Sequence, residues 1–145
     1  MPITINGSGT VTGISAGGLP DDCITTAEIA AAAVTTAKLG SSEASGLAKA
    51  WVNFNGTGTV AIRASFNVSS ITDNGTGDYT VNFTTALADA NYSVVGACGN
   101  GSTGSFVFRS NAYASAPTTS AVRISTANSA FSAADTEYVS IAIFR

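Results

Sequence analysis

The sequence contains no histidine and few charged residues, and both absences narrow what the chain can do. Charged side chains make up 10% of the 145 residues, with six Lys and Arg, nine Asp and Glu and a formal net charge of −3. Without His, catalytic triads built on His, His general bases and His-ligated metal sites are excluded. Six cations spread along the chain form no basic stripe for nucleic acid.

Cysteines, targeting signals and long apolar runs are also scarce. Cys23 and Cys98 are too few for a disulfide framework, and we expect both to be reduced thiols. The opening MPITINGSG has neither the positive nor the apolar region of a secretory signal. No run approaches the roughly 18 apolar residues of a membrane span. We therefore expect assembly in a cytosolic compartment and no membrane insertion.

Catalytic patterns are weak throughout the sequence. Glycoside cleavage needs a pair of carboxylates, and the C-terminal region offers five, of which the first three lie where turns favour Asp. These five are Asp73, Asp78, Asp89, Asp135 and Glu137. A pair formed across subunits stays open as an alternative. The GTG and NGTG stretches lack the Lys of a phosphate-binding loop and are predicted to be turns. We expect no enzyme, no metal and no cofactor.

From Trp51 onward, apolar and polar residues alternate with the period of a β-strand. Gly, Asn and Asp separate these stretches, as in the turn predicted at residues 73–77. Seven or eight short strands predict a mainly β fold with a C-terminal antiparallel, jelly-roll-like β-sandwich. The residues predicted to share the buried faces are Val60, Ile62, Ala64 and Phe66, then Tyr79, Val81 and Phe83, then Phe106 and Phe108, and finally Val122 and Ile124.

The last strand, in EYVSIAIF, is apolar on both faces. Its two sets of side chains are Val139, Ile141 and Ile143 on one face and Tyr138, Ala142 and Phe144 on the other. A strand of this kind needs two burying surfaces. We expect one to be the sandwich core and the other to be a neighbouring subunit.

Between residues 24 and 39 the sequence repeats a ten-residue unit, ITTAEIA and then VTTAKLG. Large apolar residues recur every fifth position, a spacing that gives no single stripe on a helix and no single face on a strand. We predict short helical turns near Thr25 and Thr35 in a thin stem, with the apolar residues at the axis of a trimer. These axis candidates are Ile24, Ile29, Val34 and Leu39. One amphipathic helix over residues 25–49, broken at Gly40, remains the alternative.

These differences in composition and pattern divide the chain into three regions. Residues 1–22 are predicted to be an extended attachment segment, residues 23–50 an Ala-rich repeat stem, and residues 51–145 a β-sandwich knob. The stretches ITINGSGTVTGI, the repeats, AKAWVNFNGTGTVAIRASFNVSSITDNGTGDYTVNF and the closing VSIAIFR resemble the small fibre proteins of tailed bacteriophages. The resemblance implies a homotrimer that attaches to the phage tail or baseplate by its N-terminus and contacts the host with its distal knob.

Two loops are candidates for receptor contact, GNGSTG and SNAYASAPTTS, because their amides and hydroxyls suit hydrogen bonds to sugars. The candidate residues are Asn100, Ser102, Thr103, Asn111 and Tyr113. We expect a virion protein, a tail fibre that recognises a glycan or protein receptor on the bacterial surface. The alternative is a purely structural virion protein, such as a head fibre, decoration protein or baseplate component.

Overall fold

The described part of the chain folds into two antiparallel sheets. A computed structural model describes residues 34–35, 38–39, 46–101, 106–110 and 115–145. Its compact units are Met1–Leu39 and Gly40–Arg145. The second unit holds eight strands: β1 Ala48–Asn55, β2 Ala61–Phe66, β3 Val68–Gly75, β4 Asp78–Phe83, β5 Ser93–Gly99, β6 Phe106–Ser110, β7 Ala121–Asn128 and β8 Tyr138–Phe144. The expected mainly β fold is confirmed.

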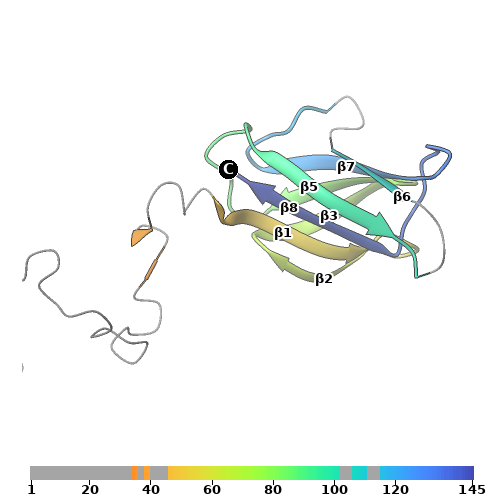
Figure 1. The fold of residues 1–145 in the computed structure, drawn as a ribbon, viewed down its shortest axis with the longest axis horizontal. Helices are drawn as coiled ribbons and strands as arrows, with labels where there is room; N and C mark the ends of the chain where they lie inside the picture. The colour runs from red at the N-terminus through yellow and green to blue at the C-terminus, as the bar shows by residue number, and fades with distance from the viewer. Residues whose placement is uncertain (1–33, 36–37, 40–45, 102–105, 111–114) are drawn as a thin grey trace, which may run out of the picture. The chain divides into compact units, whose positions relative to one another are not determined.

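Each sheet has four strands, in the orders β2-β1-β8-β5 and β3-β4-β7-β6. The chain passes from one sheet to the other after β2, β4, β5 and β7, so both sheets contain strands from distant parts of the sequence (Figure 1). The last strand, β8, lies inside its sheet between β1 and β5.

One hydrophobic core lies between the sheets and draws on both. The Phe54 ring of β1 meets the Tyr79 ring of β4 edge to face, with centroids 5.2 Å apart. The alternation predicted in DYTVNF is confirmed, because Tyr79, Val81 and Phe83 are all buried. Beside these, the core contains Ala50, Val52, Phe54, Val68, Val122, Ile124, Val139, Ile141 and Ile143.

The alternation predicted for β2 is wrong. Ile62, Ala64 and Phe66 are all exposed, Phe66 by 54%. Asn53 of β1 pairs with Ala64 and Phe54 pairs with Ile62, so Arg63 is the extra residue of a bulge in β2. A bulge opposes an extra residue to the partner strand and redirects the side chains that follow. Because β2 is also an edge strand, it contributes little to the core.

Of the predicted stem, the structure describes only residues 34–35, 38–39 and 46–50, and the stem stays a prediction. Lys38 N donates to Thr35 O at 2.9 Å, the bond expected of a short helical turn that begins near Thr35. Ala48 and Lys49 already belong to β1, so the alternative helix does not reach residue 49. The strand also begins three residues before the boundary expected at Trp51. The turn near Thr25 and the attachment segment lie outside the described residues.

The strand directions give the sandwich two distinct ends. At one end, which we call the base, β1 begins at Ala48 and pairs with Phe144, next to the C-terminus (Figure 1). The opposite end, which we call the tip, holds the turns that leave β1, β3, β5 and β7. The chain therefore enters and leaves the sandwich at its base, and the tip is formed by turns alone.

Candidate binding surfaces

A buried network joins three turns of the tip. Asp135 Oδ1 accepts from Gly77 N at 2.7 Å and lies 2.8 Å from the Tyr79 hydroxyl. The same hydroxyl lies 2.8 Å from Gly56 O, and Gly56 N donates to Thr136 O at 3.0 Å. Burial and the Asp135 carboxylate raise the pKa of Tyr79 well above its ordinary value, so the hydroxyl keeps its proton. The turns after β1 and β3 and the connection before β8 are therefore held as one unit.

The connection between β7 and β8 presents an aromatic side chain at the tip. Phe131 is 67% exposed and has φ of 60°, a left-handed conformation that bulky residues rarely adopt. Its N–H donates to Asn128 O at 2.9 Å, and Asn128 Oδ1 accepts from Ala130 N and Ser132 N at 3.0 Å each. These bonds fix the turn in spite of the strain at Phe131.

Arg109 of β6 supports the same turn. Its guanidinium donates to Phe131 O at 3.3 Å and lies 5.6 Å from the centroid of the Phe131 ring. A guanidinium over an aromatic face is attracted by the ring quadrupole. Within the described part of the chain, no carboxylate forms an ion pair with Arg109, whereas Arg63, Arg123 and Arg145 each have one. The Phe131 turn thus offers an aromatic face beside a positive charge.

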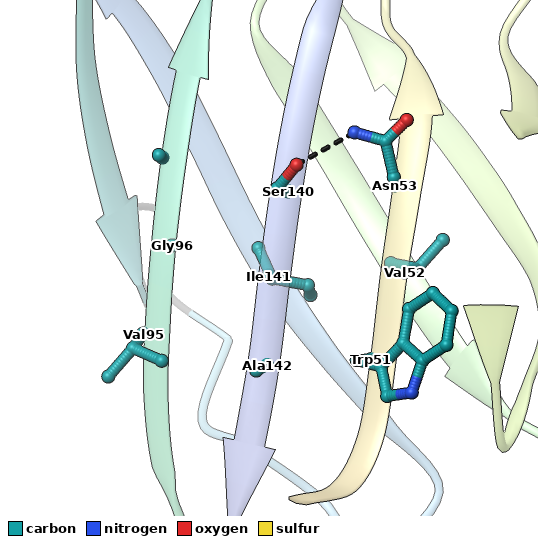
Figure 2. Close-up of a pocket in the computed structure, with 9 residues that line it drawn as sticks. Trp51, Val52, Asn53, Val95, Gly96, Ser140, Ile141 and Ala142 are labelled. Atoms are coloured by element: carbon teal, nitrogen blue, oxygen red, sulfur yellow. Dashed lines mark hydrogen bonds between the residues drawn. The ribbon is translucent and has the colours of Figure 1, made fainter. Parts of the chain in front are cut away.

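A second surface is the outer face of the β2-β1-β8-β5 sheet (Figure 2). Directly paired residues share a face, so the register places two rows of four side chains on this outer side. The rows are Phe66, Trp51, Ala142 and Val95, and then Ala64, Asn53, Ser140 and Ala97. We call these eight residues the outer face. None of them carries a charge, and Trp51, Phe66 and Val95 are 40%, 54% and 51% exposed.

The surface of the outer face contains a depression. A shallow depression of about 450 Å³ lies over the small residues Ala97, Ser140 and Ala142, between the side chains of Trp51 and Val95 (Figure 2). Its two polar side chains bond to each other, with Asn53 Nδ2 donating to Ser140 Oγ at 2.7 Å. The second apolar face predicted for the last strand is confirmed by this arrangement. What covers it is a separate question.

The other sheet has a polar outer side. Asn82 Nδ2 donates to Ser70 Oγ at 3.1 Å and to Thr72 Oγ1 at 3.0 Å. Arg123 of β7 forms a two-pronged ion pair with Asp78 of β4. Hydrogen bonds from Arg123 hold the pKa of Asp78 below its usual value, against the opposing effect of burial. The two outer sides of the sandwich therefore differ in chemistry, one polar and the other apolar.

We expect the Asp78 ion pair to stabilise the fold at neutral pH and to lose that effect in acid. Because the pKa of Asp78 in the folded state lies below its ordinary value of 3.8, the contribution is complete above that value and declines as the pH falls through the folded-state pKa. Arg123→Gln should lower the free energy of unfolding by about 2 kcal/mol at neutral pH. Urea denaturation should show this difference shrinking below about pH 4. A difference that stays constant with pH would contradict the assignment.

A second depression, of about 440 Å³, lies at the base. Asn67 in its wall has φ of 54° and donates to Lys49 O and Thr85 O, both at 3.1 Å. Arg145, also in the wall, pairs with Asp89 and lowers the pKa of that carboxyl. The polar groups here brace the connections of the base, and we assign the depression no ligand.

Of the predicted receptor contacts, the structure describes Asn100 alone. It is half-buried, and its Oδ1 accepts from Glu137 N at 2.6 Å, so this atom braces the connection before β8. Ser102, Thr103, Asn111 and Tyr113 lie outside the described residues. Asn100 follows β5 at the tip, whereas β6 and β7 meet at the base, so the two candidate loops connect strands at opposite ends.

The trimer-axis candidates are described in part. Val34 is 58% exposed and Leu39 is half-buried, and Ile24 and Ile29 lie outside the described residues. Cys98, on the inner side of β5, is a free thiol whose pKa is raised by burial. Cys23 also lies outside the described residues, and its reduced state stays a prediction.

Sequence reasoning missed Phe131 and the outer face as a unit. The signal for Phe131 was a single aromatic in a Ser- and Ala-rich turn. In the described part of the chain, no three His, Cys, Asp or Glu side chains gather as metal ligands, and no helix has the length and apolarity of a membrane span. Comparisons with protein-family models, curated proteins and solved structures found no significant match.

Proposed function

We propose that the chain is a trimeric tail fibre protein of a bacteriophage, attached to the virion by residues 1–22 and recognising a receptor on the bacterial surface through the tip of its sandwich. The observation that carries the proposal is the Phe131 turn. A bulky residue held at positive φ costs roughly 1 kcal/mol or more, and such outliers point to function where the surroundings enforce them.

The position of the turn supports the same role. A fibre attached through its N-terminal region reaches the sandwich at the base, where β1 begins, so the tip lies farthest along the chain path within the sandwich. The network of Asp135, Gly77 and Tyr79 holds the tip rigid, which lowers the entropy lost when a partner binds. Three tips in one fibre would multiply a modest affinity through effective concentration.

The receptor contact would combine the Phe131 ring with the Arg109 guanidinium. An aromatic ring packs against the apolar face of a sugar or a side chain, and a guanidinium binds carboxylate or phosphate groups. We therefore favour a receptor that presents an apolar surface beside an anionic group. The predicted contacts Asn100, Ser102 and Thr103 stay candidates for further hydrogen bonds to the receptor.

The purified protein should slow adsorption of the parent phage to its host, and Phe131→Asn should remove most of this effect. Asn tolerates the left-handed conformation better than Phe, so the fold should be kept. The matched control is Ala86→Asn, which introduces the same side chain at the exposed base. Adsorption competition with equal amounts of each protein is the measurement. If both variants compete as well as the parent protein, the tip is not the receptor contact.

A further inference from the structure

The feature that the tip leaves unexplained is the outer face. Trp51, Phe66 and Val95 stand exposed in one row that crosses all four strands. With strands about 4.8 Å apart and a rise of about 3.3 Å per residue, the face covers roughly 300 Å². Exposed patches made mostly of apolar side chains often mark an interaction surface in soluble proteins.

We propose that copies of this chain meet through the outer face, which each subunit turns towards the axis of the trimer. The inference rests on the oligomer in the proposed function and names the surface that forms it. Small side chains let neighbouring sheets approach each other closely. Ala64, Ala97 and Ala142 are small residues of this kind, and they alternate on the face with the protruding side chains.

The shape of the face suits its own copy. The Trp51 ring stands beside the depression over Ala142, Ser140 and Ala97 (Figure 2), and Phe66, its partner in the register, extends the row to the edge strand. Around a threefold axis each copy presents the same ring and the same depression, so Trp51 of one subunit can fill the depression of the next. Aromatic side chains packed into such depressions supply most of the binding energy in many interfaces.

Charge supports the same occupant. A copy of the chain carries the same net charge of −3, and like charges placed opposite each other oppose association. The outer face has no charged residue, whereas the other sheet carries Asp78 and Arg123 on its outer side. A saccharide fits less well, because two of the eight side chains are polar and they bond to each other.

The size of the face sets a limit on its contribution. A standard interface takes about 800 Å² from each partner, so roughly 300 Å² is less than half of one. Other residues must supply the rest of the contact.

Trp51 is the single tryptophan of the chain and reports on the face directly. In the full-length protein at micromolar concentration, we expect its emission to be blue-shifted and protected from acrylamide. Light scattering should then give about 43 kDa, three times 14.4 kDa. On dilution, the emission should shift to the red and quenching should rise together with the fall in mass.

Two variants test whether the outer face mediates self-association without disturbing the fold. Val95→Asp, on the edge strand β5, should weaken self-association by at least about 10-fold, because it places like charges in the contact. Its control is Thr72→Asp on β3, the edge strand of the other sheet, which should change association less than about twofold. Circular dichroism should show that both variants are folded, and Phe66→Asp tests the opposite edge of the face.

Three other outcomes would each overturn the inference, and the measurements distinguish them. If acrylamide quenched Trp51 freely in a species of about 43 kDa, the chain would still be a trimer, but the outer face would not be its interface. A monomer at all micromolar concentrations would overturn the interface and the proposed trimer together. If the Trp51 emission shifted when a bacterial polysaccharide was added and stayed unchanged on dilution, the outer face would be a saccharide site.

Discussion

Gly77→Ala should lower the free energy of unfolding by about 4 kcal/mol, the largest loss that we expect from a single substitution in the turns. Gly77 has φ of 65°, and an added Cβ would lie 2.7 Å from Ala134 N and closer still to Thr126 O. Both contacts are backbone atoms, and Thr126 N itself donates to Gly77 O at 2.9 Å. No side chain can rotate away to make room.

Gly58 supplies the control for this experiment. Its φ of 62° is nearly the same, but an added Cβ would meet nothing within 4 Å. Gly58→Ala should therefore cost about 1 kcal/mol, the conformational part alone. Urea denaturation of both variants separates the cost of the backbone conformation from the cost of the close contacts made by the added Cβ. Equal losses at the two positions would show that the close approach at Gly77 does not contribute.

Asp135→Ala should lower the free energy of unfolding by about 3 kcal/mol, because it removes a shared acceptor from two buried groups of the tip. Gly77 N would lose its partner, and the Tyr79 hydroxyl would keep Gly56 O alone. Asp135→Asn retains a side-chain oxygen and should cost about 1 kcal/mol. Denaturation at neutral pH measures both losses, and similar values for Ala and Asn would argue that the acceptor oxygen is unimportant.

The same substitution links stability to binding. If the network fixes the tip, Asp135→Ala should also weaken adsorption competition at temperatures where the protein remains folded. A variant that is less stable but competes as well as the parent would separate the rigidity of the tip from recognition.

Local patterns predicted the strands well where one face is buried. The alternation in DYTVNF and the two apolar faces of the last strand are both found in the structure. The pattern failed in β2, because alternation gives the side on which residues lie but not whether another layer covers it. The bulge at Arg63 breaks the alternation of β2, and its position depends on the pairing with β1, which the sequence of β2 alone does not show.

The binding surfaces were less accessible to sequence reasoning. The tip network joins Gly77 to Asp135, 58 residues apart, and such pairings depend on the topology of the sheets. The outer face likewise needs the register of four strands from three parts of the chain. The exposed Phe131 was hidden because its strained turn depends on Asn128 and on Arg109 of another strand.

The measurement that tests the central claim most directly is electron microscopy of the parent virus labelled with an antibody against residues 51–145. Receptor recognition by a tail fibre predicts label at the free ends of the tail fibres and slower adsorption of the labelled particles. Label over the head, with adsorption unchanged, would contradict the claim and would make the chain a structural component of the capsid.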